Sequence, residues 1–284
     1  MVSLTIGGIM QNYVRWKTGL DYWVILPISI AGLVHHMSTA AISIVYHRGA
    51  THGAVELDPR ITTYADNLVQ FIAWVNLDEW KPAHETHHRH ADTLKDPHSP
   101  KNDGLFLMLL DPFIRYNQKI KALIQEWIID PRLTNTPIQK LLFPVLTANA
   151  YIWTFGNMNG LIAILASYGL LKWAAWTVNW LGHNHETKRR EYGKSFAQNI
   201  GENPKGIIGN LKSILLNFLT AGEHHHGNHH LKPQSADISL WWSTGFDIWF
   251  FYIQVLEKLW LAKILWNFDR EGKISVNKGI KVGK

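Results

Sequence analysis

The chain has 284 residues, of which 46% are hydrophobic and 14 are Trp, and its formal net charge is +6. The sequence contains no Cys, which excludes disulfide bonds, Cys-ligated iron–sulfur clusters and Cys nucleophiles, so any metal must use His, carboxylate or carbonyl ligands. Lys and Arg are scattered and form no single stripe. This favours an anionic membrane surface or an acidic protein as partner, and no nucleic-acid partner is expected.

The first predicted element is a membrane-spanning helix over residues 23–46. This stretch is about one bilayer thickness long and contains no Asp, Glu, Lys or Arg. His35 and His36 lie in its middle, where a His normally marks an interior face or a polar contact. Residues 1–22 lack the basic start and cleavage site of a signal peptide, and we expect an amphipathic lead-in there.

The first histidine pair, His47 and His52, follows the end of this helix. A spacing of five residues does not suit one face of an α-helix. The pair is therefore predicted to occupy a helix end and the turn after it, with Gly49 allowing the bend. Taken alone, such a pair could arise by chance.

A second histidine group is the motif H-x-x-H-H at His84, His87 and His88. Residues 61–80 before it show apolar residues at helical spacing, and we expect an amphipathic helix that leads directly into the motif. In a helix, positions i, i+3 and i+4 project from one face, so the three imidazoles would lie a few ångströms apart.

Two further spans, 141–157 and 159–180, are predicted to form a transmembrane hairpin with an uncharged turn. Near its return end lie Asn179 and His183, an i, i+4 pair on one helical face. The Gly- and Lys-rich tail, 269–284, is expected to be frayed.

The densest group is Gly222-Glu-His-His-His-Gly-Asn-His-His230, which repeats H-x-x-H-H at His226, His229 and His230. A solvated His-rich loop or an expression tag are the plainer interpretations, but a tag is not expected inside a chain and interrupted by Gly and Asn. His-rich tracts of this kind indicate metal binding.

The hydrophobic pattern brings all the histidine groups to one side of a membrane. The first span ends at His47, and the hairpin goes out and returns to His183. We therefore expect an all-α fold, one domain over residues 1–284, with about three spans and a helical cap formed by 47–140 and 181–268. Basic residues gather on the cap side, so the positive-inside tendency places the cap in the cytoplasm. The compact length favours a bacterial inner membrane over the endoplasmic reticulum.

The groups together supply nine imidazole ligands, which is too many for one metal and suits two metals with four or five ligands each. Hydrolytic di-zinc sites usually include carboxylates, which are sparse in these motifs. Two redox metals at a membrane surface indicate dioxygen chemistry on a lipid-borne substrate. Carboxylates near the motifs are candidates to accept hydrogen bonds from the second ring nitrogens: Asp66, Asp78, Glu79, Glu85, Asp92, Asp96 and Glu223.

This arrangement of histidine motifs resembles the integral-membrane fatty acid desaturases, most closely the Δ9-type acyl-CoA and acyl-lipid group, from about Ile42 to Ala262. The resemblance implies a non-haem centre of two irons held by nine His, O2 as co-substrate, and a contact through water from Asn179. It also implies insertion of a cis double bond into an acyl chain linked to CoA, acyl carrier protein or a glycerolipid. The electrons would come from a separate donor such as a ferredoxin or cytochrome b5.

The sequence departs from that family pattern in two places. There is room for one span before the first motif, where the family usually has two, so we expect a shortened membrane domain. His224 and His225 stand where the family has Gly and an aromatic residue, which leaves an extra-ligand role for His225 open. A related di-iron hydroxylase, ketolase or fatty acid decarboxylase, and more remotely a non-enzymatic membrane metal-binding protein, are the alternatives.

Overall fold

The computed structural model describes residues 22–73, 75–97, 99–100, 146–152, 157–183, 197–200, 206–220, 222–240 and 245–268. The described part is mostly helical, in agreement with the expected all-α class, and adds one small two-stranded sheet. The expected cap segment 101–140, the tail 269–284 and nearly all of the lead-in 1–22 lie outside the described residues.

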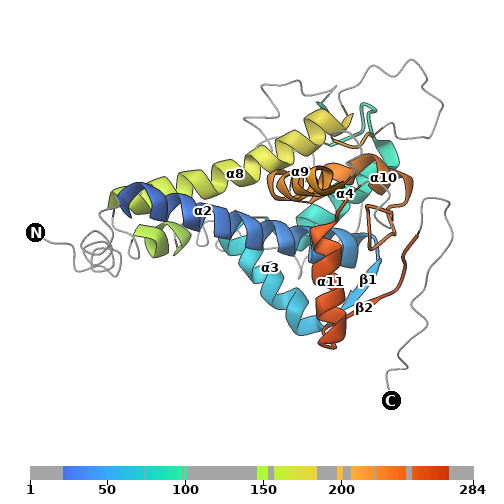
Figure 1. The fold of residues 1–284 in the computed structure, drawn as a ribbon, viewed down its shortest axis with the longest axis horizontal. Coiled ribbons are helices and arrows are strands. Elements are labelled where there is room, and N and C mark those ends of the chain that lie inside the picture. The colour runs from blue at the N-terminus through green and yellow to red at the C-terminus, as the bar shows by residue number, and fades with distance from the viewer. Residues whose placement is uncertain are drawn as a thin grey trace, which may run out of the picture.

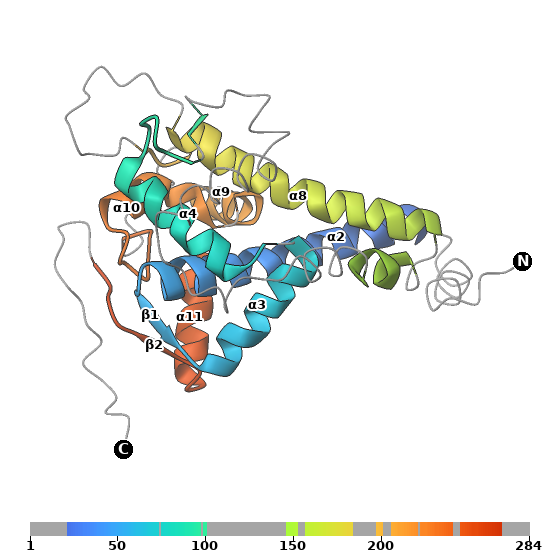
Figure 2. The same cartoon turned by 180° about the vertical axis from the view of Figure 1, so that it is seen from behind.

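Two long helices project together from a compact lobe (Figures 1 and 2). They are α2 (Tyr22–Ala40) and α8 (Asn157–His183), and both run from the projecting end toward the lobe. Within the described residues, two helical stretches are long and apolar enough to cross a membrane, Ser29–Thr51 and Met158–His183. Their parallel course delivers both C-terminal ends to the lobe.

The predicted middle span, 141–157, falls largely outside the described residues. Its residues 146–152 are helical and lie beside the projecting end of α2 (Figure 1). The next helix begins at Asn157. The return helix is therefore longer at both ends than the predicted range 159–180.

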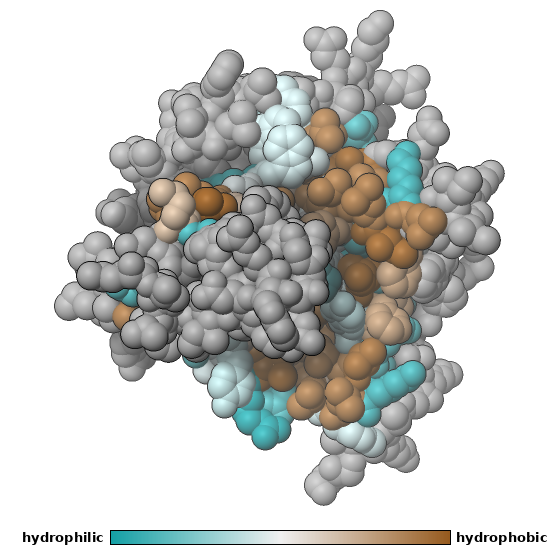
Figure 3. Space-filling view, turned by 60° about the vertical axis from the view of Figure 1, so that its left-hand side comes forward, coloured by the Kyte–Doolittle hydropathy of each residue, from teal (hydrophilic) through white to brown (hydrophobic). Residues whose placement is uncertain are grey.

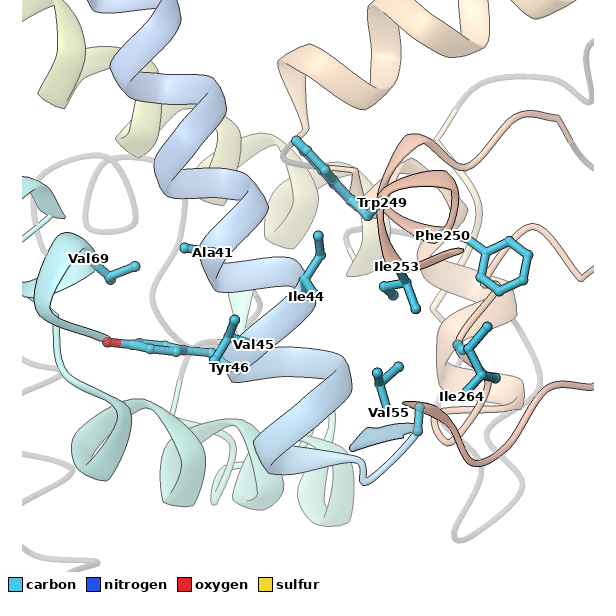
Figure 4. Close-up of a cluster of buried hydrophobic side chains, with 12 residues drawn as sticks. Ala41, Ile44, Val45, Tyr46, Val55, Val69, Trp249, Phe250, Ile253 and Ile264 are labelled. Atoms are coloured by element: carbon cyan, nitrogen blue, oxygen red, sulfur yellow. The ribbon is translucent and has the colours of Figure 1, made fainter. Parts of the chain in front are cut away.

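Only the first part of the predicted span, 23–46, lies outside the lobe. It continues beyond α2 as a π-helix, η1 (Ala41–Thr51). Ile44, Val45 and Tyr46 of η1 are almost fully buried in the hydrophobic core of the lobe (Figure 4). An apolar run without charges fits a protein core as well as a lipid environment, and hydrophobicity alone does not separate the two.

The rest of the lobe consists of short elements around η1. The predicted helix 61–80 is two helices, α3 (Pro59–Ala73) and α4 (Leu77–His90), because Asn76 breaks the run and accepts a hydrogen bond from the Glu79 N–H as an N-cap. The third motif follows α9 (Gly206–Leu219) and lies on two short helical pieces, η2 (Glu223–His225) and α10 (His226–Leu231).

The C-terminal region forms a helix and then a strand. Helix α11 (Ile248–Lys258) packs its buried face on the core, and β2 (Ala262–Ile264) follows it. Strand β2 pairs antiparallel with β1 (Val55–Leu57), with Val55 opposite Ile264. This pairing ties the C-terminal region to the turn after the first histidine pair.

A buried ion pair joins η1 to α11. Arg48 and Asp247 are 1% and 2% exposed, and the Arg48 Nη2 atom lies 3.0 Å from Asp247 Oδ2. The same carboxylate accepts hydrogen bonds from the N–H groups of Trp249 and Phe250 at the start of α11, and from Ile238 N–H. Arg48 directly follows His47, so this pair fixes the end of the first helix against the C-terminal region.

We expect Arg48→Met to lower the free energy of unfolding by about 3–5 kcal/mol, because it leaves a buried carboxylate without its counter-charge. Thermal unfolding of the purified protein in detergent measures this change. The matched control is Arg60→Met, because Arg60 pairs with Asp58 at the surface and its side chain is 76% exposed. Equal shifts in the two variants would contradict a structural role for the buried pair.

Candidate metal centre

The first histidine pair lies at a helix end and the turn after it, as predicted: His47 is near the end of η1, and His52 is the C-cap residue that follows Thr51. In the π-helix η1, the His52 N–H donates to the His47 carbonyl five residues earlier, at 3.1 Å. Because a π-helix bonds residue i to i+5, it places residues five apart one above the other. The ring centroids of His47 and His52 are 4.9 Å apart. A spacing of five residues, which does not suit one face of an α-helix, therefore suits the end of this π-helix.

The second and third motifs lie on α-helices, as predicted, but each triad is divided between two places. In α4, His84 and His88 point one way and His87 the other; in α10, His229 separates from His226 and His230. Nine imidazoles thus form a five-His group and a four-His group. The five-His group contains His47, His52, His84, His88 and His229, and the four-His group contains His87, His183, His226 and His230.

The distances between ring nitrogens in each group fit ligands of one metal. In the five-His group, Nε2 of His229 lies 2.9 Å from Nε2 of His47 and 2.8 Å from that of His88. In the four-His group, Nε2 of His226 lies 2.8 Å from Nε2 of His183 and 3.1 Å from that of His230. A metal–nitrogen distance of about 2.1 Å puts ligands at right angles about 3.0 Å apart.

The contacts of the Nδ1 atoms indicate, for three of the nine imidazoles, which ring nitrogen carries the proton. Three Nδ1 atoms face carboxylates: His47 faces Glu223 at 2.9 Å, His87 faces Asp96 at 3.0 Å, and His183 faces Asp92 at 3.4 Å. An Nδ1–H that donates to a carboxylate leaves a bare lone pair on Nε2. The lone pairs then converge on one another, which is the donor set of a cation site.

Three of the seven carboxylates predicted to support the ligands therefore lie in that position. Two of the others have different partners. Asp66 accepts from the Tyr46 hydroxyl, and Glu85 pairs with Lys81 and Arg89 on the surface of α4. Asp92 reaches His183 from a backbone with φ of 63°, a left-handed conformation that non-glycine residues rarely adopt.

Burial and mutual repulsion favour the neutral form of five of these imidazoles. Desolvation, followed by the charges of neighbouring His, holds the pKa of four of them well below the usual range; these are His84, His226, His229 and His230. The pKa of His52 is also lowered, for the same reasons. A neutral imidazole offers its lone pair to a metal without first losing a proton, so protons compete little for the site near pH 7.

The remaining predicted residues lie apart from the two groups. Asn179 is on α8 one turn before His183, and its amide donates to the Ala175 carbonyl at 2.9 Å. His35 contacts the Phe218 carbonyl and His36 the Tyr252 hydroxyl, as polar contacts of the kind expected.

The unusual pair His224 and His225 also lies outside both groups. Both side chains are buried, with their ring centroids 3.7 Å apart, and His224 Nε2 lies 3.0 Å from the Ser213 hydroxyl of α9. Desolvation lowers the pKa of His225 to about 4. The geometry gives these residues a packing role beneath the third motif.

Two glycines beside the histidine motifs are required by close packing. Gly222 has φ of +78°, and a Cβ there would overlap the Trp249 indole. On α8, a Cβ at Gly182 would lie 2.7 Å from Cδ2 of His226. Each glycine directly adjoins a histidine motif, and this position is the one sequence signal that could have identified them.

Comparison with known proteins agrees with the geometry. The model of the fatty acid desaturase family matches residues 21–244. An acyl-CoA 5-desaturase of Anemone leveillei is 27% identical over 76% of this chain and 64% of its own length, so the alignment spans less than two thirds of that relative. A Delta-9 desaturase-like protein of Arabidopsis thaliana is 26% identical over 80% of this chain and 72% of its own length. An acyl-CoA C20 Delta5-desaturase of Anemone leveillei is 24% identical over 87% and 73%.

We expect Gly182→Ala to remove most of the metal bound by the four-His group, because the added methyl group displaces the His226 ring. Metal content of the purified protein, measured by mass spectrometry, is the readout. Gly169→Ala on the same helix is the control, since a Cβ there has nothing within 4 Å. If Gly182→Ala and Gly169→Ala bind equal amounts of metal, the close packing of α8 on His226 does not govern the site.

Proposed function

Because the chain belongs to the fatty acid desaturase family, we propose that it introduces a cis double bond into a fatty acyl chain in an O2-dependent reaction at two irons. The observation that carries this proposal is the convergence of nine buried or half-buried His from four segments into a group of five and a group of four. Such a donor set suits first-row redox metals and contains no carboxylate ligand.

Each histidine group would hold one iron. The five-His group would supply Nε2 ligands to the first iron and the four-His group to the second. We propose that Asn179, one turn before His183, approaches the second iron through a water. When bound, the pair of irons would supply the oxidising power to remove two hydrogen atoms from neighbouring methylene groups, with O2 reduced to water.

The protein's own residues orient and protect that centre. Glu223, Asp96 and Asp92 hold protons on the Nδ1 atoms of three ligands, so their Nε2 lone pairs stay aimed inward. Ser43 donates to Glu223 at 2.9 Å and fixes that carboxylate. The ligands His87, His183 and His229 are at most 2% exposed, which keeps bulk water away from the reacting carbon atoms.

The two projecting helices support a placement in a membrane. We propose that α2 and α8 cross a bilayer and that the lobe lies on the cytoplasmic side, which basic residues of the lobe such as Arg60 and Lys81 support. Among the three acyl carriers, we favour CoA, because the two Anemone relatives are named acyl-CoA desaturases. A separate donor such as a ferredoxin or cytochrome b5 would deliver two electrons, with the basic face attracting an acidic protein.

The test of the proposed function is the acyl-chain profile of an expressing host that lacks its own desaturase of this kind. We expect a new cis monoene at one fixed position, located by mass spectrometry of its dimethyl disulfide adduct. A host expressing His87→Ala at the same level is the control. A hydroxylated chain, a carotenoid product or a terminal alkene without an internal double bond would contradict desaturation.

Alanine at His87, His183 or His229 is expected to abolish the new product and to remove at least one of the two irons, because each of these side chains is a proposed ligand. Iron content and product yield are measured on the same preparations. His90→Ala serves as the matched control, since His90 lies on α4 outside both groups. Full activity in any of the three variants would show that the altered residue is no ligand.

A further inference from the structure

Helix α9, which leads into the third histidine motif, has its polar side against the protein. Ser213, Asn217 and Thr220 are fully buried. The Asn217 amide donates to the Phe246 carbonyl at 2.6 Å, and its oxygen accepts from the Ile248 N–H at the start of α11. The polar side chains on this face of α9 therefore make their hydrogen bonds inside the protein.

The opposite side of α9 is apolar and exposed. Leu211, Ile214 and Leu215 are 62%, 44% and 58% exposed, and their spacing places them on one face of the helix. A helix on a water-covered lobe has the reverse arrangement, with its apolar stripe toward the core. The inverted polarity of α9 therefore indicates an apolar environment outside the protein.

Contacts with α2 place this face beside the projecting helices. The carbonyl of Phe218 near the end of α9 contacts His35, and Tyr252 of α11 contacts His36. On α2, Leu33 and Met37 beside this level are also exposed. In Figure 3, where the projecting end comes forward, hydrophobic side chains gather in broad patches on the face behind it. The exposed apolar residues of α9 thus lie on a helix that contacts the projecting helix α2.

We propose that α9 lies in the interfacial layer of the lipid bilayer, with Leu211, Ile214 and Leu215 among the acyl chains. Interfacial helices bury their apolar face about 5–10 Å into the boundary between headgroups and acyl chains, and Lys212, exposed on α9, suits anionic headgroups.

This placement has a consequence for the metal centre. The Gly222 N–H donates to the Asn217 carbonyl at 2.7 Å, so the end of α9 continues directly into the turn before the third motif. A helix held at the lipid surface would fix the height of His226, His229 and His230 above the bilayer. The lipid layer thereby takes part in positioning the site toward a chain that enters from the membrane.

The inference rests on the proposed crossing of the bilayer by α2 and α8, and the absence of Cys from the sequence allows the two to be tested separately. Single cysteines are introduced at Leu215 and Leu211 on α9, at Leu165 on α8, and at Leu94 after α4. Leu165 and Leu94 are 62% and 94% exposed. Each variant is labelled with a nitroxide and reconstituted in vesicles of phosphatidylcholine and phosphatidylglycerol. Relaxation by O2, which dissolves in lipid, is compared with relaxation by a water-soluble nickel chelate.

We expect the ratio of O2 to nickel accessibility at Leu215 and Leu211 to resemble that at Leu165 and to exceed that at Leu94 several-fold. Labels on α9 as open to nickel as the label at Leu94 would overturn the inference while leaving the membrane crossing intact. If Leu165 also reports water, the membrane crossing fails as well. If the α9 labels are shielded from both agents, and spin–spin broadening disappears on dilution with unlabelled protein, a second copy covers this face and the inference is wrong.

Discussion

The constraint on which the structure depends is the packing of nine buried or half-buried imidazoles with their Nε2 atoms facing one another. A neutral imidazole has one donor and one acceptor, and at His47, His87 and His183 the proton is placed on the outer nitrogen by a carboxylate. The inner nitrogens are then acceptors turned toward acceptors. Desolvation makes protonation of His84, His226, His229 and His230 costly, so a bound cation is the partner that would satisfy the inner nitrogens.

The scaffold meets this constraint by bringing four separated segments to one place. Helices α2 and α8 run in parallel; α2 continues into η1, which carries His47, and α8 ends at His183. Between them, α4 and α10 each distribute one triad over both groups. No single motif builds one group alone, so the two groups form only when the whole lobe is folded. The buried Arg48–Asp247 pair and the close approach of Gly182 to His226 hold these segments in register.

Much of this arrangement could be predicted from the sequence, because histidine spacing and hydrophobic runs are local signals. The three-residue and four-residue spacings in His84–His88 and His226–His230 specify helical faces. The hydrophobic runs, which alternate with polar segments, predicted that the histidine motifs meet at one side of a membrane. The structure brings these motifs together. Whether Asn179 takes part stays a prediction, since its amide donates to Ala175.

Other features depend on contacts that no local pattern encodes. The π-helix at His47 and His52 needs a wider turn than the sequence suggests, and the division of each triad depends on how α4 and α10 cross. The core position of Ile44 to Tyr46 could not be separated from a lipid-facing one by hydrophobicity. Likewise the strand β2 is defined by its partner β1 and not by its own residues.

The most direct test of the paired histidine groups is an anaerobic titration of the metal-free protein with Fe²⁺, followed by X-ray absorption at the iron edge. Two equivalents should bind per chain, and both should show a shell of nitrogen and oxygen scatterers with the multiple-scattering pattern of imidazole, four to five per iron. Saturation at one equivalent, or a shell without imidazole scattering, would contradict a two-iron centre built from these nine His.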